Sequence, residues 1–262
     1  MVEHKLDVFG VIGSSPIPPT MNIKIIYEDK DVLVIDKPAG FVVFPEGPAS
    51  AKATAGEAKT VIDYLVEKYP ELKAAGDAPR YGIVHRLDKD TSGIVLVAKS
   101  TEALIFLQKC FKNRGVEKKY VCLAEGSVKD DFGEMKTLIA RSPRDPRKQT
   151  VYEIADPTAP KSAREAITEY KVLERFKDYT LLEVNIKTGR RHQIRCHLSY
   201  LQHPIAGDKL YGFKNSKSPE GLTRQFLHAK QLKIQLPSGK KEIFISELPE
   251  ELKKVTDKLA RK

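Results

Sequence analysis

The stretch GIVHRLDKDTSGIVLVAKS, residues 82–100, places a carboxylate directly before a strongly apolar segment. Asp88 lies two residues after Arg86 and ahead of the apolar run at residues 94–98, which predicts a buried strand. An ionised carboxylate that is removed from water is costly unless a cation and hydrogen-bond donors hold it. Two roles therefore fit Asp88, that of a turn or capping carboxylate and that of a shielded reactive group.

A second group of chemically capable residues occurs in TGRRHQIRCHLSYLQHPIAGDKLYG, residues 188–212. The spacing predicts a helix over residues 191–202, and on it Arg191 and Arg195, four residues apart, share one face. Gly189 stands at the expected strand-to-helix junction, where a positive φ favours glycine. This segment can therefore present a pair of cations to an anionic group.

Histidines and cysteines give only weak support for a metal site. His192 and His197 are five residues apart, the wrong interval for two ligands on one helical face, and the chain contains no CxxC pair. We expect reduced, buried thiols at Cys110, Cys122 and Cys196, and neither a metal nor a cofactor. A metal-dependent hydrolase built on His192, His197 and His203 is a disfavoured alternative.

Strands predominate among the elements that must position these residues. Helices are predicted after Thr60 and Ser100, which are candidate N-caps, with Gly115 ending the second helix, and again near the C-terminus. Strands or hairpins are predicted over residues 22–37, 116–126, 134–187 and 230–246. Because hairpins outnumber βαβ units, we predict an α+β fold with a mixed, largely antiparallel central sheet flanked by helices and loops.

Length and composition describe one soluble globular unit. The chain has 262 residues, 41% hydrophobic and 31% charged, and no apolar run approaches the roughly 20 residues of a membrane span. We predict a flexible N-terminal extension over residues 1–21 and a single catalytic domain over residues 22–262. The N-terminus is not typical of a secretory signal, which predicts a cytoplasmic protein; we expect a monomer, with no protein or membrane partner implied.

The charge balance is basic, with 45 lysines and arginines against 35 aspartates and glutamates. Cations that neutralise phosphates release counterions, so this excess favours a polyanionic partner such as RNA. The loop at residues 140–150 is the densest candidate, and it is equally typical of a solvated loop. Its basic residues are Arg141, Arg144, Arg147 and Lys148.

Taken in order along the chain, the motifs resemble those of the RluA-type pseudouridine synthases. The series is KPAG (37–40), HRLDKDTSG (85–93), KKY (118–120), TGRRHQIRCH (188–197), GDKLYG (207–212) and LHA (227–229). The resemblance covers about residues 22–248. Members of this family isomerise uridine to pseudouridine in structured RNA without a cofactor, and the resemblance implies the same fold and activity here, with rRNA or tRNA as substrate.

The resemblance assigns roles to three residues. Asp88 matches the catalytic aspartate, which acts as a nucleophile or assists deprotonation at the sugar. Arg195 matches the arginine that pairs with this carboxylate and holds it ionised. Tyr120 matches the tyrosine that packs on the target base after the base leaves the RNA stack, and its hydroxyl is a candidate for serving as, or orienting, the base that removes the C5 proton.

Further residues are expected near the RNA. In a strand-like segment Arg86 and Asp88 share a face, so Arg86 either pairs with Asp88 or contacts phosphate, and we prefer phosphate because Arg195 supplies the pair. His85 and Lys37 are expected mainly to shape the loops, with Lys37 able to approach a phosphate. Together with the basic loop, the predicted RNA-binding residues are Arg86, His85, Lys37, Arg141, Arg144, Arg147, Lys148 and Arg191.

The sequence also departs from many relatives. Only about 21 residues precede the first predicted strand, too few for the S4-like N-terminal RNA-binding domain that many of them carry, so we expect the catalytic domain itself to provide targeting. A catalytically silent RNA-binding module or RNA chaperone on the same fold is the main alternative. It leaves the combination of acid, arginine and tyrosine unexplained.

Overall fold

A computed structural model describes residues 21–45 and 59–260; of the predicted extension, residues 1–20 lie outside the described part. The described chain forms a ten-stranded sheet, four α-helices and a short 3-10 helix. All of the strand pairs in it are antiparallel except β3 with β9, which confirms the prediction of a mixed, largely antiparallel α+β fold. The strands are β1 (Lys24–Glu28), β2 (Val32–Lys37), β3 (Ser92–Ala98), β4 (Glu117–Glu125), β5 (Phe132–Arg141), β6 (Gln149–Tyr152), β7 (Arg164–Arg175), β8 (Tyr179–Ile186), β9 (Leu227–Gln235) and β10 (Lys241–Ile245).

The helices begin where the sequence provides N-caps. Thr60 and Asp63 form a reciprocal capping box at the start of α1 (Val61–Lys68), and the Ser100 hydroxyl accepts from the backbone N–H of Ala103 at the start of α2 (Thr101–Lys112). Both predicted caps are confirmed. The 3-10 helix η1 (Pro70–Ala74) follows α1, and the remaining helices are α3 (Gln193–Tyr200) and α4 (Glu250–Asp257).

The start of α3 differs from the prediction. His192, the N-cap residue, has a left-handed backbone with φ of 54°, whereas Gly189 is absent from the positive-φ glycines. Arg191 therefore precedes the helix and is exposed, while Arg195 is buried. The expectation that these two arginines share a helical face is wrong, because the tight turn at His192 separates them.

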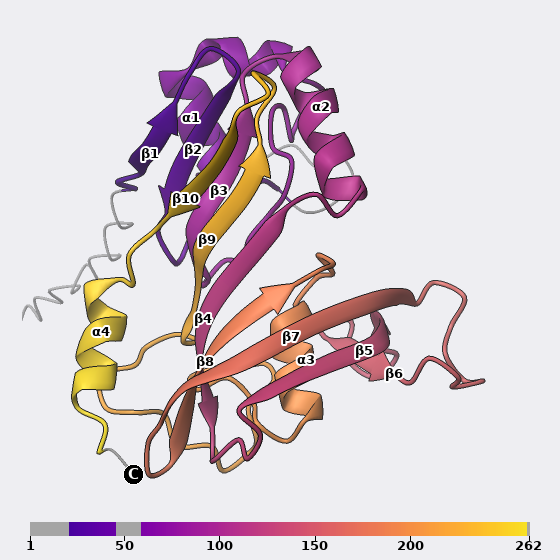
Figure 1. The fold of residues 1–262 in the computed structure, drawn as a ribbon, viewed down its shortest axis with the longest axis vertical. Coiled ribbons are helices and arrows are strands. Elements are labelled where there is room, and N and C mark those ends of the chain that lie inside the picture. Colours follow the sequence, from indigo (N-terminus) through magenta and orange to yellow (C-terminus); the bar gives the residue numbers. More distant parts are fainter. Residues whose placement is uncertain (1–20, 46–58, 261–262) are drawn as a thin grey trace, which may run out of the picture.

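The sheet order is β1-β2-β3-β9-β4-β8-β7-β5-β6, with β10 paired to β9. Figure 1 shows β4 running between two groups of elements, with α1 and α2 beside β1–β3 and α3 beside the strands β5–β8. Segments close to the start of β3 and the start of α3, which are far apart in the sequence, therefore meet near β4. A single domain over residues 22–262 stays a prediction. None of the helices in the described ranges is both long and apolar enough to cross a membrane.

The largest apolar cluster joins the two groups of elements. Its fully buried members include Leu33 on β2, Leu123 on β4, Leu182 on β8 and Phe226 just before β9. Burying each such side chain contributes about 1.5–3 kcal/mol relative to leaving it in water. This shared core holds the loop that precedes β3 in a constant position relative to α3.

Gly93 explains one requirement of the motif at residues 85–93. It has φ of 115°, and a Cβ at this position would lie 2.3 Å from the carbonyl oxygen of Ala229 on β9. Only glycine allows the parallel contact between β3 and β9 at this point. Because the loop of Asp88 leads directly into β3, this contact fixes where the loop joins the sheet.

Candidate active site

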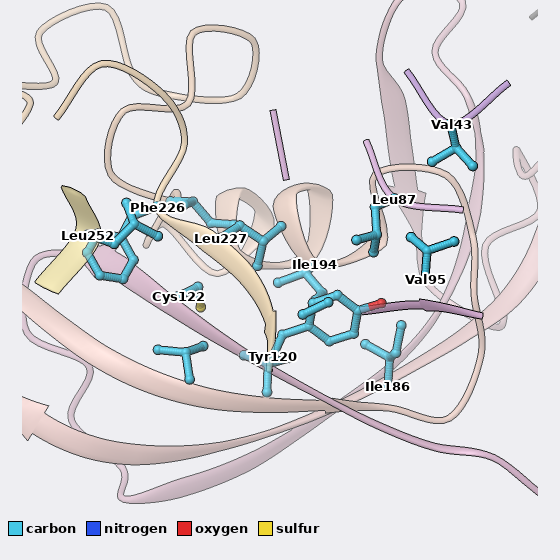
Figure 2. Close-up of a cluster of buried hydrophobic side chains, with 14 of the residues drawn as sticks. Val43, Leu87, Val95, Tyr120, Cys122, Ile186, Ile194, Phe226, Leu227 and Leu252 are labelled. Atoms are coloured by element: carbon cyan, nitrogen blue, oxygen red, sulfur yellow. The ribbon is translucent and has the colours of Figure 1, made fainter. Parts of the chain in front are cut away.

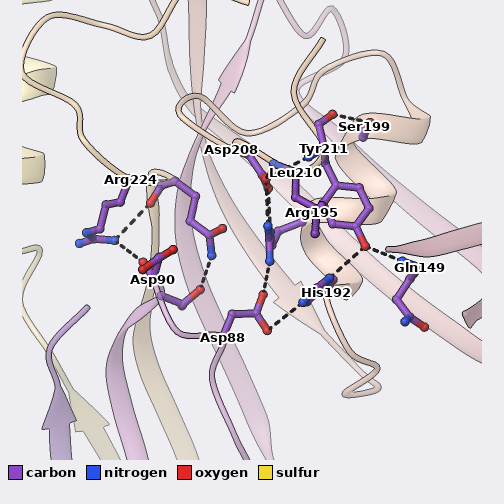
Figure 3. Close-up of polar contacts among 12 residues, drawn as sticks. Asp88, Asp90, Gln149, His192, Arg195, Ser199, Asp208, Leu210, Tyr211 and Arg224 are labelled. Carbon is purple, nitrogen blue, oxygen red and sulfur yellow. Dashed lines mark hydrogen bonds and ion pairs between the residues drawn. The ribbon is translucent and has the colours of Figure 1, made fainter. Parts of the chain in front are cut away.

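Asp88, Arg195 and Asp208 form a chain of ion pairs (Figure 3). The Nη1 of Arg195 donates to Oδ2 of Asp88 at 2.9 Å, while its Nε and Nη2 donate to the two carboxylate oxygens of Asp208 at 2.7 and 2.9 Å. Asp88 precedes β3, Arg195 lies on α3, and Asp208 follows α3. The tertiary structure therefore brings Asp88 to Arg195 from 107 residues away, and the pairing that the resemblance implied is present.

Asp208 fixes the guanidinium from its far side. Its side chain is completely buried, and its Oδ1 also accepts from the backbone N–H groups of Leu210 and Tyr211 at 2.9 and 3.0 Å. Burial alone would raise the pKa of Asp208, but the hydrogen bonds and charge of Arg195 and these backbone donors lower it overall. A bidentate carboxylate that stays ionised leaves one edge of Arg195 for Asp88.

Arg195 stays charged in this setting. Burial alone would lower its pKa, but the hydrogen bonds and charge of Asp208, followed by Asp88, raise it above its usual range. Its Cζ also lies 5.1 Å from the centre of the Tyr211 ring, a cation–π contact. The site therefore keeps a permanent cation beside Asp88.

His192 and Tyr211 extend this network on one side. The Nε2 of His192 lies 3.9 Å from Oδ1 of Asp88, and its Nδ1 lies 3.0 Å from the Tyr211 hydroxyl. That hydroxyl accepts from the backbone N–H of Gln149 at 2.6 Å. Burial lowers the pKa of His192, with Asp88 opposing the shift, so the ring is held largely neutral next to Asp88.

The loop carrying Asp88 is held by cations that donate to its backbone. Lys37 is completely buried, and its ammonium donates to the carbonyl oxygens of Pro38, Phe41 and Lys89 at 2.8–3.0 Å. Arg224 donates to the carbonyl oxygen of Asp90 at 3.0 Å. Lys37 thus has no N–H left for a phosphate, which corrects the expectation that it contacts RNA: it shapes the loop.

Tyr120 projects from β4 into the same region. Figure 2 shows its ring among the side chains of Leu87, Ile186 and Ile194. It is 8% exposed, and burial, followed by the charge of Asp88, raises its pKa above the usual range. The hydroxyl is therefore a neutral phenol at physiological pH.

A cavity of about 570 Å³ opens where these elements meet, and both Asp88 and Tyr120 line it. Asp88 is the only carboxylate among the described residues that line this cavity. The lining is otherwise strongly basic, with arginines and lysines from three stretches of the chain, residues 80–86, 112–118 and 187–195. These cations are Arg80, Arg86, Lys112, Arg114, Lys118, Lys187, Arg190, Arg191 and Arg195.

Three of the expected RNA-binding residues, Arg86, His85 and Arg191, line this cavity. Arg86 lies outside any strand, with its Cζ 5.3 Å from the centre of the Phe44 ring. His85 accepts from the backbone N–H of Leu96 through Nε2, and burial lowers its pKa to about 3. His85 thus serves mainly to anchor the loop to β3. Arg86 and Arg191 line the cavity and remain candidates for RNA contact.

The basic loop lies between β5 and β6 and is absent from the cavity lining. Arg147 pairs with Asp145 through two donors, and Arg141 donates to the carbonyl oxygen of Pro146. The Nζ of Lys148 lies 5.8 Å from the centre of the Tyr211 ring. The loop therefore borders the site through Tyr211, and its role in RNA binding stays a prediction.

The histidines of the hydrolase alternative do not converge. His197 contacts the hydroxyls of Thr137 and Thr168, His203 contacts the carbonyl oxygen of Glu125, and His192 belongs to the Asp88 network. Within residues 21–45 and 59–260, no three His, Cys, Asp or Glu side chains are arranged to hold a metal ion. The sequence analysis gave Asp208 no role of its own, and its place in the GDKLYG motif is the signal that could have identified it.

The site thus combines one cation-bound carboxylate with a basic cavity. A family model described as RNA pseudouridylate synthase matches residues 31–200. The chain is 43% identical over 207 residues to an uncharacterized RNA pseudouridine synthase of Aquifex aeolicus, covering 78% of this chain and 61% of that protein. It is 36% identical over 259 residues to the ribosomal large subunit pseudouridine synthase D of Xylella fastidiosa, covering 94% and 72%. The chain belongs to the RNA pseudouridylate synthase family.

Solved structures agree with the fold. Human RNA pseudouridylate synthase domain containing 4 superposes with a TM-score of 0.69 at 24% identity, over 89% of this chain and 91% of that one. The corresponding human domain containing 1 gives 0.68, also at 24% identity, over 87% and 84%. The family and the enzyme class predicted from the sequence motifs, an RNA pseudouridine synthase, are confirmed.

Proposed function

We propose that the protein isomerises specific uridines to pseudouridine in structured RNA, with Asp88 as the catalytic carboxylate, Arg195 as its partner and Tyr120 as the platform for the target base. One observation carries the proposal: Asp88, ion-paired to Arg195, is the only carboxylate among the described residues lining a basic cavity. The cations attract the RNA backbone, and the carboxylate is the group left to react.

The chemistry balances without any co-reactant. The C1′–N1 bond breaks, the uracil turns, a C1′–C5 bond forms, and the proton lost from C5 is matched by one gained at N1. Asp88 acts either by attacking C1′ or by assisting deprotonation at the sugar. Arg195 keeps it ionised and oriented, and Asp208 keeps Arg195 in place.

Tyr120 supports a base that has left the RNA stack. A flipped base needs an aromatic or apolar surface to replace its lost stacking, and Tyr120 lines the cavity together with Ile186 and Ile194. Because its pKa is raised, its hydroxyl is suited to donating a hydrogen bond and poorly suited to removing the C5 proton. This favours a role in which the ring stacks on the flipped base and the hydroxyl orients the reacting groups through a hydrogen bond.

Of the candidate substrates, we favour ribosomal RNA. Several relatives that match most of this chain carry the name ribosomal large subunit pseudouridine synthase D, among them those of Xylella fastidiosa and Xanthomonas campestris. Transfer RNA is the second candidate, since the basic cavity selects for phosphate and not for one class of RNA. A cytoplasmic, monomeric enzyme is the form that we propose.

The test is pseudouridine formation by purified protein on ribosomal RNA transcribed in vitro, mapped chemically. Asp88→Asn is expected to bind this RNA with the wild-type Kd and to form no product, because the amide is not an effective nucleophile. Asp90→Asn, which removes an exposed carboxylate two residues away, is the matched control and should retain wild-type turnover. Undiminished product from Asp88→Asn would refute the proposed role, and no product from the wild type on either ribosomal or transfer RNA would refute the function.

A further inference from the structure

A second cavity, of about 640 Å³, adjoins the catalytic one, and Arg114 and Lys187 line both. It lies over the start of β4, the end of β8 and the β9–β10 hairpin. The polar side chains that line it elsewhere are Glu117, Lys119, Asn185, Lys233, Gln235 and Lys241. We call this second cavity the hairpin groove.

Strand register explains why these side chains gather on one face of the sheet. Lys119 on β4 is opposite Asn185 on β8, and Glu117 on β4 is opposite Lys233 on β9. Gln235, two residues further along β9, is opposite Lys241 on β10. Opposite residues, and residues two apart along a strand, point to the same face, so a polar stripe crosses four adjacent strands.

The reverse face of the same strands is apolar. Leu232 and Ile234, which alternate with Lys233 along β9, are buried in a core cluster with Phe244 of β10 and with residues of α2. Because residues alternate between the two faces of a strand, the lysines point away from this core. The stripe is exposed on the β9–β10 hairpin and half-buried on β4 and β8.

The charge on the stripe is only partly balanced within the protein. Lys119 contacts Glu183 and Glu117 at 3.2 and 3.7 Å. Lys233 and Lys241 are exposed and form no ion pair with any residue in the described ranges. These two lysines can therefore bind an anion without first breaking an ion pair to a described residue.

The two residues shared between the cavities are also accessible cations. Arg114 pairs with Glu165 at 2.7 Å, and Lys187 pairs with Glu169 at 2.9 Å, all four side chains being more than a third exposed. Exposed pairs of this kind contribute at most about 1 kcal/mol and exchange readily for another anion. Arg114 and Lys187 thus form a cationic link between the catalytic cavity and the hairpin groove, and their exposed glutamate partners hold them only weakly.

We propose that the RNA strand bearing the target uridine leaves the catalytic cavity across Arg114 and Lys187 and continues along the hairpin groove, where Lys233 and Lys241 bind its phosphates. This inference rests on the proposed function and extends it to substrate recognition. The continuity with the catalytic cavity favours RNA over an acidic protein segment. The described lining of the groove also contains none of the aromatic anchors typical of protein interfaces.

The experiment compares the binding of 3- and 20-nucleotide oligouridylates by full-length protein across a range of salt concentrations. In the double variant Lys233→Gln/Lys241→Gln we expect the affinity for the long oligonucleotide to fall about tenfold. The slope of log K against log salt should become shallower by about 1.4, since each single-stranded phosphate contact contributes about 0.7. The affinity for the short oligonucleotide should not change, because it fits within the catalytic cavity.

The matched control is Lys129→Gln/Lys254→Gln, which removes two exposed lysines that line neither cavity. Equal affinity for the long oligonucleotide and equal salt slope in the two double variants would overturn the inference. The hairpin groove would then bind an acidic protein segment or no partner at all. An equal loss for the short oligonucleotide would overturn it as well. Because the groove variant retains Asp88, its pseudouridine formation at saturating RNA should match the wild type, so loss of the groove and failure of the proposed function are distinguishable.

Discussion

Replacing Asp208 by asparagine tests whether the buried carboxylate positions Arg195 for Asp88. Asp208 makes two charge-assisted hydrogen bonds to the guanidinium and two more to backbone N–H groups. An amide is nearly the same size but has one acceptor oxygen and no charge. In Asp208→Asn one of the guanidinium donors therefore faces an NH₂ group, and Arg195 keeps only Asp88 as an ionic partner.

The magnitude follows from the burial of the pair. Breaking a buried ion pair by removing one partner costs 3–5 kcal/mol, and asparagine, which retains part of the hydrogen bonding, belongs at the low end, about 3 kcal/mol. With about 2 cal/mol/K of unfolding entropy per residue, this corresponds to a fall in Tm of about 5 °C. A displaced Arg195 misplaces Asp88, which should lower kcat about 10- to 100-fold.

Thermal unfolding and single-turnover pseudouridine formation measure the two effects. The control is Asp131→Asn, which removes an exposed carboxylate paired with Arg175 at 2.7 Å and should cost less than about 1 kcal/mol. Wild-type Tm and kcat in Asp208→Asn would refute the reasoning. A fall in Tm with an unchanged kcat would restrict Asp208 to stability.

The same variant has a defined pH dependence. The pKa of Asp208 is lowered in the folded protein, so its ion pair stabilises the fold above the unfolded pKa near 3.8 and is lost as the pH falls through the folded value. The difference in unfolding free energy between wild type and Asp208→Asn should be constant near neutral pH and shrink below about pH 4. A difference that grows on acidification would contradict the ion-pair account.

Two further predictions concern Tyr120 and His197. Tyr120→Phe should bind RNA with the wild-type Kd and lower kcat at least tenfold, since it loses the hydroxyl and keeps the ring; wild-type kcat would limit Tyr120 to stacking. Burial lowers the pKa of His197 from 6.5 to about 4, so the unfolded chain takes up a proton that the folded protein does not. Compared with His197→Gln, the wild type should lose about 3 kcal/mol of unfolding free energy between pH 7 and 4, measured by urea denaturation, and parallel pH profiles would contradict this.

Local elements were predictable because their signals lie within a few residues of one another. The caps at Thr60 and Ser100 depend on hydrogen bonds to N–H groups three residues away. The β7–β8 and β9–β10 hairpins follow from alternating apolar residues on either side of a turn. Such patterns indicate which residues face a core, and the motif order was enough to identify the family.

Contacts between segments distant in sequence could not be predicted from such local patterns. The packing of segments distant in sequence decides that Lys37 is buried beneath the Asp88 loop and that Lys119 on β4 lies beside β9 of the hairpin groove. Periodicity says which side of a strand is apolar, but not which strand lies next to it. The sequence by itself determined most of the elements and named Asp88 as the candidate catalytic acid. Only the tertiary structure placed Asp208 behind Arg195, because packing between distant segments decides which charges meet out of water.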